Sequence, residues 1–256
     1  MADFIKDFWQ SQAEKHKAAH SASWGDNWAI DLEVENIGSY IKEGDTVLDM
    51  GCANGFAAIR QLARNPKKIY GVDFSEKMID YAQNERENHP EKDKLDFRVG
   101  DIRKIGFDDE TFDVTYTTRT IINLPNWQDQ IQAINEVIRV TKKGGTIVIS
   151  EAFWEPLVLL NAMRALVNLP SLVEHDFNRY IKKEKLEKYL ESINLKYTCV
   201  EFSSVYYLGS RFLRDLVTNP SDYAGYSNPL NEVFYNIEKQ YSGGGMGIQQ
   251  AYVISK

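Results

Sequence analysis

The segment 47–55, VLDMGCANG, joins a predicted strand to a predicted helix and carries the strongest local signal for a binding site. Gly51 and Gly55 can adopt positive φ angles, and they let the backbone approach a ligand without a clash from a Cβ atom. Asp49, at the end of the strand, places a carboxylate beside that ligand. The segment therefore predicts a ligand at the start of the helix, next to a negative charge.

Two more acids follow the next two predicted strands. The carboxylate of Asp73 could accept hydrogen bonds from both hydroxyls of a ribose, and Asp101 could accept one from the exocyclic amine of a purine. Three carboxylates at successive strand ends suit a nucleoside that carries a positive charge, whereas Asp49 would repel the pyrophosphate of a dinucleotide. The alternative is that Asp73 and Asp101 simply cap helices. We interpret Cys52 as a small packed residue rather than a nucleophile, because nothing local would lower its pKa.

These acids need a scaffold, and the pattern of residues 46–150 predicts one. Short β-branched runs alternate with longer amphipathic stretches: the runs lie at 46–49, 68–72, 95–99, 112–116 and 146–149, and the stretches near 56–64, 75–86 and 127–141. The last stretch ends in KKGG at 142–145, which is typical of a helix stop. The alternation predicts an α/β fold with a doubly wound, mostly parallel sheet and a ligand at the carboxyl ends of its strands.

The rest of the chain is predicted to cover that ligand. We expect an N-terminal helical lid at 1–45, a cofactor-binding core at 46–150 and a cap insertion at 151–180. Residues 181–256 would complete the core with strands at 195–202 and 246–255, and would hold a second cap insertion at about 204–245. Such segments are candidates for binding a substrate, because function concentrates on loops held by a rigid scaffold.

The motifs LDMGCANG, GVDFS, GDI and FDV, followed by RVTKKGG, resemble those of the class I S-adenosylmethionine-dependent methyltransferases. The resemblance is strong over residues 40–150 and implies a seven-stranded Rossmann-like sheet whose last strand, at 246–255, is antiparallel. It implies S-adenosylmethionine as cofactor, with its methionine part at the glycine turn, its ribose at the second acid and its adenine beside the third. The implied cofactor-binding residues are Asp49, Gly51, Cys52, Asn54, Gly55, Asp73, Phe74, Met78, Asp101, Ile102 and Thr118.

A methyl acceptor with a high pKa needs a general base. Many small-molecule relatives have a histidine near the position of Asn123, and this chain does not. It also lacks the Asn/Asp-Pro-Pro-aromatic signature of enzymes that methylate amino groups of nucleic acids and protein glutamines. Both absences favour a small-molecule acceptor. His20 in the lid and His175 in the first cap are the candidate bases; the alternative for His20 is a position on a partly exposed amphipathic helix.

The predicted substrate-binding residues combine aromatic and cationic side chains. Arginine binds carboxylate or phosphate through paired hydrogen bonds, so the set favours a small anionic metabolite as substrate. The members of the set are Trp24, Arg119, Arg164, Tyr206 and Arg211. For Arg119 the alternative is a structural salt bridge, for Arg211 a solvated charged face, and for Trp24 packing in the core. We find no set of ligands at metal-binding spacing.

Composition limits the partners. The chain carries 30 basic and 37 acidic residues among 256, a net charge of −7, which disfavours bulk binding to nucleic acid. No apolar stretch has the length of a membrane span, the N-terminus lacks a signal-peptide pattern, and two cysteines are too few for a disulfide scaffold, so we expect a cytoplasmic protein. A homodimer is compatible with the sequence. The sequence thus predicts a methyltransferase acting on O or N of a small metabolite; the alternatives are a catalytically silent cofactor-binding partner and a nicotinamide-dependent oxidoreductase.

Overall fold

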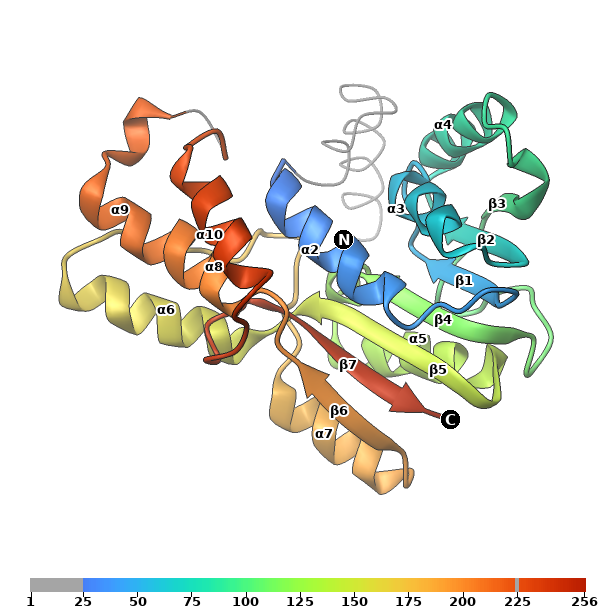
Figure 1. The fold of residues 1–256 in the computed structure, drawn as a ribbon. Helices are drawn as coiled ribbons and strands as arrows, with labels where there is room; N and C mark the ends of the chain where they lie inside the picture. The colour runs from blue at the N-terminus through green and yellow to red at the C-terminus, as the bar shows by residue number, and fades with distance from the viewer. Residues whose placement is uncertain (1–24, 224–225) are drawn as a thin grey trace.

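A seven-stranded sheet forms the centre of the computed structural model, which describes residues 25–223 and 226–256 (Figure 1). The strand order is β3-β2-β1-β4-β5-β7-β6, and the first five strands pair in parallel. β7 is antiparallel to both of its neighbours. From the β1–β4 pair the chain builds the sheet outward in opposite directions, with β2 and β3 beyond β1 and β5 beyond β4. The carboxyl ends of β1 and β4 therefore flank the crevice where ligands bind in such sheets. The predicted fold class is confirmed.

The strands follow the predicted runs closely, because buried β-branched segments bounded by turns leave little choice. Their bounds are β1 Thr46–Met50, β2 Lys68–Asp73, β3 Leu95–Val99, β4 Phe112–Thr118, β5 Thr141–Ala152, β6 Lys196–Val200 and β7 Gln249–Ser255. Asp49 lies within the last two residues of β1, and Asp73 ends β2.

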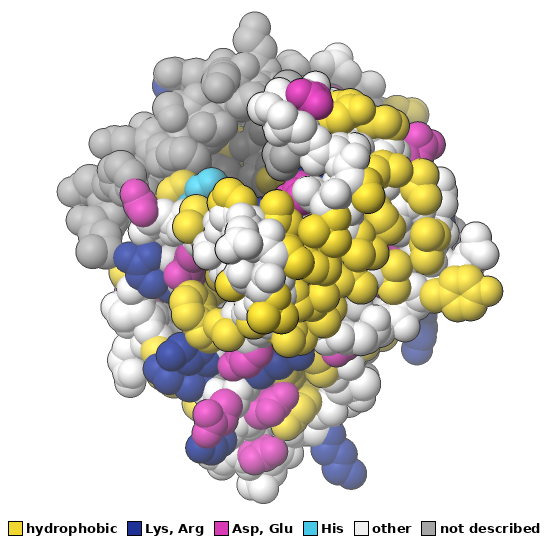
Figure 2. Space-filling model, turned by 90° about the vertical axis from the view of Figure 1, so that its left-hand side faces the viewer, with side chains coloured by type: hydrophobic (Ala, Val, Ile, Leu, Met, Phe, Trp, Pro, Cys, Tyr) yellow, Lys and Arg dark blue, Asp and Glu magenta, His cyan; other side chains and the backbone are white. Residues whose placement is uncertain are grey.

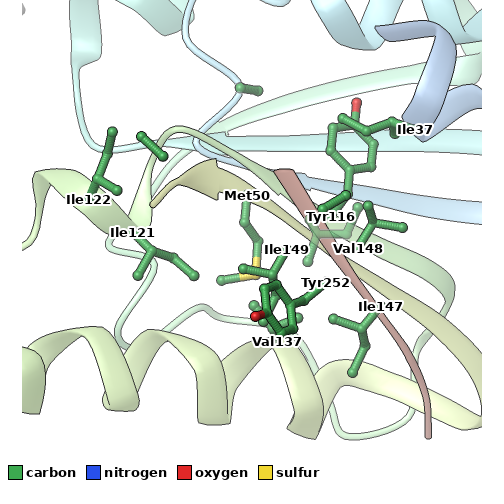
Figure 3. Close-up of a cluster of buried hydrophobic side chains, with 14 of the residues drawn as sticks. Ile37, Met50, Tyr116, Ile121, Ile122, Val137, Ile147, Val148, Ile149 and Tyr252 are labelled. Carbon is green, nitrogen blue, oxygen red and sulfur yellow. The ribbon is translucent and has the colours of Figure 1, made fainter. Parts of the chain in front are cut away.

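Helices cover both faces of the sheet. α2 (Asn27–Gly38), α3 (Phe56–Arg60) and α4 (Glu76–Glu87) lie on one face, and α5 (Trp127–Val140) and α7 (Lys183–Ser192) lie on the other (Figure 1). Figure 3 shows Tyr116 of β4 pointing toward Ile37 of α2, with Val137 of α5 on the opposite side of the sheet. The side chains of all three are at most 1% exposed.

The structure differs from the prediction at two helix ends. The predicted helix near 56–64 is α3 followed by a 3-10 segment, η2 (Gln61–Arg64), which ends at Asn65 in the left-handed region. The KKGG segment at 142–145 lies inside β5 rather than in a loop after the helix. The end of the chain is the reason: the amide of Gly144 donates to the carbonyl of Lys256, and the amide of Lys256 donates to the carbonyl of Gly145.

The remaining helices gather beyond one end of the sheet, on the left of Figure 1. They are α6 (Trp154–Leu166), α8 (Ser204–Leu208), α9 (Arg214–Val217) and α10 (Leu230–Glu238), together with a π-helical turn, η5 (Gly209–Leu213). Short 3-10 turns also occur at η3 (Lys92–Lys94), η4 (Ile121–Asn123) and η6 (Pro220–Asp222). Figure 2 shows hydrophobic side chains gathered on this side of the molecule, and Val158, Leu159 and Leu166 of α6 are 42–85% exposed.

Candidate functional site

A cavity of about 180 Å³ opens where β1, β2 and β4 end. Most of the predicted cofactor-binding residues line this cavity. The lining residues are Gly51, Ala53, Asp73, Phe74, Met78, Asp101, Ile102, Arg103, Thr118, Arg119, Thr120, Asn123, Leu124 and Pro125. A smaller adjoining cavity of about 40 Å³ shares Gly51 and Arg119 with it and reaches Asp49, Cys52, Asn54 and α2.

The glycine turn brings its backbone close to the cavity. Gly51 and Gly55 have φ angles of +88° and +78°, which favour glycine. The amides of Gly51 and Cys52 both donate to the carbonyl of Val72, at 2.7 and 3.0 Å, and so tie the turn to β2. A Cβ atom on Gly51 would lie 2.0 Å from Oγ1 of Thr120. The two segments therefore meet with no room for a side chain between them.

Asp49 is a buried carboxylate for which the described residues supply no well-formed hydrogen bond. Its side chain is 1% exposed, and neither Oδ1 nor Oδ2 has a well-formed hydrogen bond within the described residues. Burial raises its pKa to about 7; the nearby Tyr116 hydroxyl opposes this effect, and the Asp73 and Glu33 carboxylates add to it. A cationic ligand would supply the missing partner, so the residue fits the positively charged cofactor predicted for this turn.

Asp73 is oriented by the backbone on both sides of it. Its Oδ2 accepts from the amide of Ala53 at 3.0 Å and its Oδ1 from the amide of Ser75 at 2.9 Å. Burial raises its pKa to about 6, opposed by these two amides. Each carboxylate oxygen can accept a further hydrogen bond, and the residue lines the cavity. A pair of vicinal hydroxyls fits this arrangement.

The other predicted cofactor residues have distinct environments. Asp101 pairs with Arg103 at 2.6 Å, and this guanidinium lowers the pKa of the carboxyl. Met78 is 1% exposed and packs against Ala53 and Tyr81, at the edge of the cavity. Cys52 is 4% exposed, and burial raises the pKa of its thiol well above its ordinary value. This environment suits a packed residue rather than a nucleophile.

Arg119 lines both cavities, in the left-handed region at φ +50°. Its Nε donates to Oε2 of Glu33 at 3.1 Å, and Oε1 of Glu33 accepts from Ser150 at 2.8 Å. This is the salt bridge that we weighed as the alternative for Arg119. Sequence reasoning missed Glu33, although an acid inside the apolar pattern IDLEV was a visible signal.

Glu151 was missed as well. It is fully buried at the end of β5 and accepts hydrogen bonds from the amides of Thr120, Ile121 and Ile122. Burial raises its pKa to about 7, opposed chiefly by the amide of Ile121. The signal in the sequence is an acid that directly follows the apolar run TIVIS, but only the fold shows which amides it meets.

The structure does not bring the other predicted substrate arginines to the cavity. Arg164 pairs with Asp215 at 2.8 Å, with both side chains 5% exposed. Arg211 pairs with Asp26, whose other carboxylate oxygen accepts from the Tyr206 hydroxyl at 2.5 Å. These side chains are buried, which differs from the solvated face weighed for Arg211, and their charges are compensated by acids. They form part of the packing of α6, α8, η5 and α9.

Of the two candidate bases, the structure describes His175. His175 is exposed and stacks on Phe177 with ring centroids 5.4 Å apart, and it is not among the described residues that line the cavity. His20 and Trp24 lie outside the described residues. The roles predicted for these three residues stay predictions.

The raised carboxyl pKa values predict that the ligand-free protein is more stable at pH 5.5 than at pH 8. Asp49, Asp73 and Glu151 have folded-state pKa values of about 7, 6 and 7. In the unfolded chain these groups titrate near pH 4, so their contribution to stability is present below that pH and lost as the pH rises through 6 to 7. We expect Tm to fall by roughly 5 °C over this interval. Thermal melts should show a smaller fall in Asp49→Asn; a Tm that rises with pH would contradict the prediction.

Comparison with known proteins places this arrangement in a family. Residues 41–201 match the family model described as "Methyltransferase domain", which is more than half of the chain. The chain belongs to this family. The methyltransferase domain so identified confirms the predicted relationship to the class I S-adenosylmethionine-dependent methyltransferases, and with it S-adenosylmethionine as the cofactor. The nicotinamide alternative finds no support.

Curated relatives are methyltransferases with diverse names. An uncharacterized methyltransferase of Schizosaccharomyces pombe is 34% identical over 44% of this chain and 42% of its own length. The 27-O-demethylrifamycin SV methyltransferase of Amycolatopsis mediterranei is 28% identical over 45% of this chain and 42% of its own. The ubiquinone biosynthesis O-methyltransferase of Coxiella burnetii is 26% identical over 76% and 79%. The chain thus spans less than half the length of the first two relatives.

Solved structures share the fold. A chain from the complex of the Haloferax volcanii Trm112 methyltransferase activator with a methyltransferase superposes with a TM-score of 0.64, at 15% identity over 96% of both chains. The geranyl diphosphate C-methyltransferase of Streptomyces coelicolor gives 0.57 at 15% identity, over 88% of this chain and 78% of its own. Among the residues described here, no helix is long and apolar enough to cross a membrane, and no three His, Cys, Asp or Glu side chains are grouped to hold a metal ion.

Proposed function

We propose that this chain transfers a methyl group from S-adenosylmethionine to an oxygen or nitrogen of a small molecule. The observation that carries the proposal is the carboxylate of Asp49 behind the Gly51 turn, which has no hydrogen-bond donor among the described residues, with Asp73 at the next strand end. A sulfonium nucleoside supplies a transferable methyl, an ammonium for a buried acid and two ribose hydroxyls for the second acid. The glycine turn lets the backbone approach such a molecule closely.

The acceptor would reach the methyl along the wall formed by residues 118–125. Arg119 and Asn123 are polar residues of this wall, and Nδ2 of Asn123 donates to the carbonyl of Arg119 at 2.8 Å. Oδ1 of Asn123 has no hydrogen-bond donor within the described structure. It could therefore accept a hydrogen bond from an acceptor hydroxyl or amine. The chain's own contribution would be mainly orientation and exclusion of water.

We propose further that the acceptor carries a carboxylate or phosphate that contacts Arg119. Among the arginines predicted to bind substrate, Arg119 is the one that lines both cavities, while Arg164 pairs with Asp215 and Arg211 pairs with Asp26. An anion at Arg119 would share the guanidinium with Glu33. Glu33 is 1% exposed and would keep its bond to Ser150, so this buried acid would retain a partner while the guanidinium is shared.

Calorimetry with S-adenosylhomocysteine tests the cofactor site, and transfer of a labelled methyl group tests the activity. We expect binding in the micromolar range, and labelling of small molecules in a deproteinised extract. Pairs of acids and their methyl esters then test the anionic group: the acid should be the better acceptor, and Arg119→Met should remove the preference. Binding without any labelled product would favour a catalytically silent cofactor-binding partner. No binding at high micromolar concentration would reject the proposal.

A further inference from the structure

Glu151 receives three consecutive backbone amides. The amides of Thr120 and Ile121 donate to its Oε1 at 3.1 and 3.0 Å, and the amide of Ile122 donates to its Oε2 at 3.3 Å. They lie where the chain leaves β4 and enters the short turn η4. The first amides of a helical turn have no acceptor within the turn itself, so they need one from elsewhere.

Burial makes this acceptor hard to replace for two of the three amides. Ile121, Ile122 and Glu151 are at most 3% exposed, so the amides of Ile121 and Ile122 are shielded from water in the described structure, whereas Thr120 is partly buried. Above its pKa of about 7, Glu151 is a carboxylate that only accepts hydrogen bonds, and its two oxygens can take all three. Glu151 also sits on a rigid base, since β5 pairs with β4 on one side and with β7 on the other, where Glu151 lies opposite Gln250.

The segment that Glu151 holds is one wall of the cofactor cavity. Six of the lining residues belong to it: Thr118, Arg119, Thr120, Asn123, Leu124 and Pro125. Within it, Thr120 lies against the glycine turn, with its Oγ1 3.5 Å from the carbonyl oxygen of Gly51. A shift of the segment would therefore change both the width of the cavity and the position of the turn.

We propose that Glu151 is a positioning residue that fixes residues 118–125 against the glycine turn and so sets the geometry of the cofactor cavity. It contacts neither the cofactor nor the acceptor, and it acts through the backbone of Thr120, Ile121 and Ile122. The inference rests on the proposed use of this cavity for S-adenosylmethionine.

Two variants test whether Glu151 acts through its hydrogen bonds to the backbone, and not only through its charge or through overall stability. In Glu151→Gln, the amide oxygen can take the place of Oε1 and keep the bonds to Thr120 and Ile121, while its NH2 group faces the amide of Ile122. Glu151→Ala removes all three acceptors. Two controls accompany them. Glu155→Gln alters a carboxylate that accepts from the amide of Lys183 at the start of α7, and Leu190→Ala destabilises the buried face of α7.

The readouts are the Kd of S-adenosylhomocysteine by calorimetry and the exchange rate of the amides at 120–122 by hydrogen exchange. One net hydrogen bond corresponds to about a 3- to 10-fold change in an equilibrium constant. We expect about that loss of affinity in Glu151→Gln and a loss of roughly 30-fold or more in Glu151→Ala, with faster exchange at 120–122 in the same order. Leu190→Ala should lower Tm without changing Kd, and Glu155→Gln should change neither Kd nor exchange at 120–122.

The outcomes distinguish the inference from the proposed function. Unchanged Kd and unchanged exchange at 120–122 in Glu151→Ala would overturn the inference while leaving the proposed function intact. A loss of affinity in Leu190→Ala as large as that in Glu151→Ala, at matched Tm, would also overturn it, because general destabilisation would then suffice. Failure of the wild type to bind S-adenosylhomocysteine, with exchange at 120–122 still faster in Glu151→Ala, would reject the proposed function while leaving the backbone anchor in place.

Discussion

Replacing Gly51 by alanine should weaken the binding of S-adenosylhomocysteine by about a hundredfold or more and lower Tm. The new Cβ atom would lie 2.0 Å from Oγ1, 2.3 Å from Cγ2 and 2.6 Å from Cβ of Thr120. Rotation of the Thr120 side chain cannot relieve the contact with its Cβ, and the amide of Thr120 is held by Glu151. Either the turn or residues 118–125 must move. Overpacking of this kind costs about 1–3 kcal/mol, to which the left-handed backbone adds about 1 kcal/mol.

A second glycine separates these two costs. Gly44 has a φ of +84°, close to the +88° of Gly51, but a Cβ atom on it would meet nothing within 4 Å. Gly44→Ala should therefore carry the backbone cost alone: a small fall in Tm and an unchanged Kd for S-adenosylhomocysteine. Equal effects of the two substitutions on Kd would show that the contact with Thr120 does not limit the site.

Replacing Asp73 by asparagine should also weaken the binding of S-adenosylhomocysteine by about a hundredfold. The variant loses the charge that strengthens hydrogen bonds from the ribose hydroxyls, each of which contributes about 1.5–3 kcal/mol when the acceptor is charged. Its NH2 group would also face the amide of Ala53 or of Ser75, both of which now donate to the carboxylate. Calorimetry gives the Kd values, and competition with adenosine and 2′-deoxyadenosine examines the ribose contact itself.

The wild type should prefer adenosine over 2′-deoxyadenosine, and Asp73→Asn should show a much smaller preference. Asp96→Asn is the matched control, because Asp96 is also a strand aspartate, is paired with Arg98 at 2.8 Å and does not line the cavity. Asp96→Asn should leave the preference for adenosine over 2′-deoxyadenosine as it is in the wild type. If Asp73→Asn lost affinity equally for the two nucleosides, the residue would act on the shape of the turn and not on the ribose.

The sequence alone was sufficient for the scaffold. Buried β-branched runs with turns between them determined the strands of the parallel sheet, and the VLDMGCANG turn, Asp73 and Asp101 at successive strand ends indicated where a cationic nucleoside would bind. These features are local: hydrophobic period, glycine conformation and the type of residue that ends a strand can all be read from a few neighbouring residues. In the structure a cavity is lined by Gly51, Asp73, Phe74, Met78, Asp101, Ile102 and Thr118, and their role in binding stays a prediction.

Only the tertiary structure decided which charged side chains remain for a ligand. The sequence does not distinguish between the three arginines predicted to bind substrate. In the structure, Arg164 and Arg211 pair with acids distant in the chain, whereas Arg119 pairs with Glu33 and also lines the cavity. Glu151 and the amides it holds are likewise about 30 residues apart. Such contacts depend on how strands and helices pack, and burial then decides whether a charge needs a partner inside the protein. Pairing of this kind leaves no local pattern in the sequence. The sequence therefore indicated the edge of the sheet where a cofactor was expected, and the fold decided which charged side chains at that edge are paired within the protein.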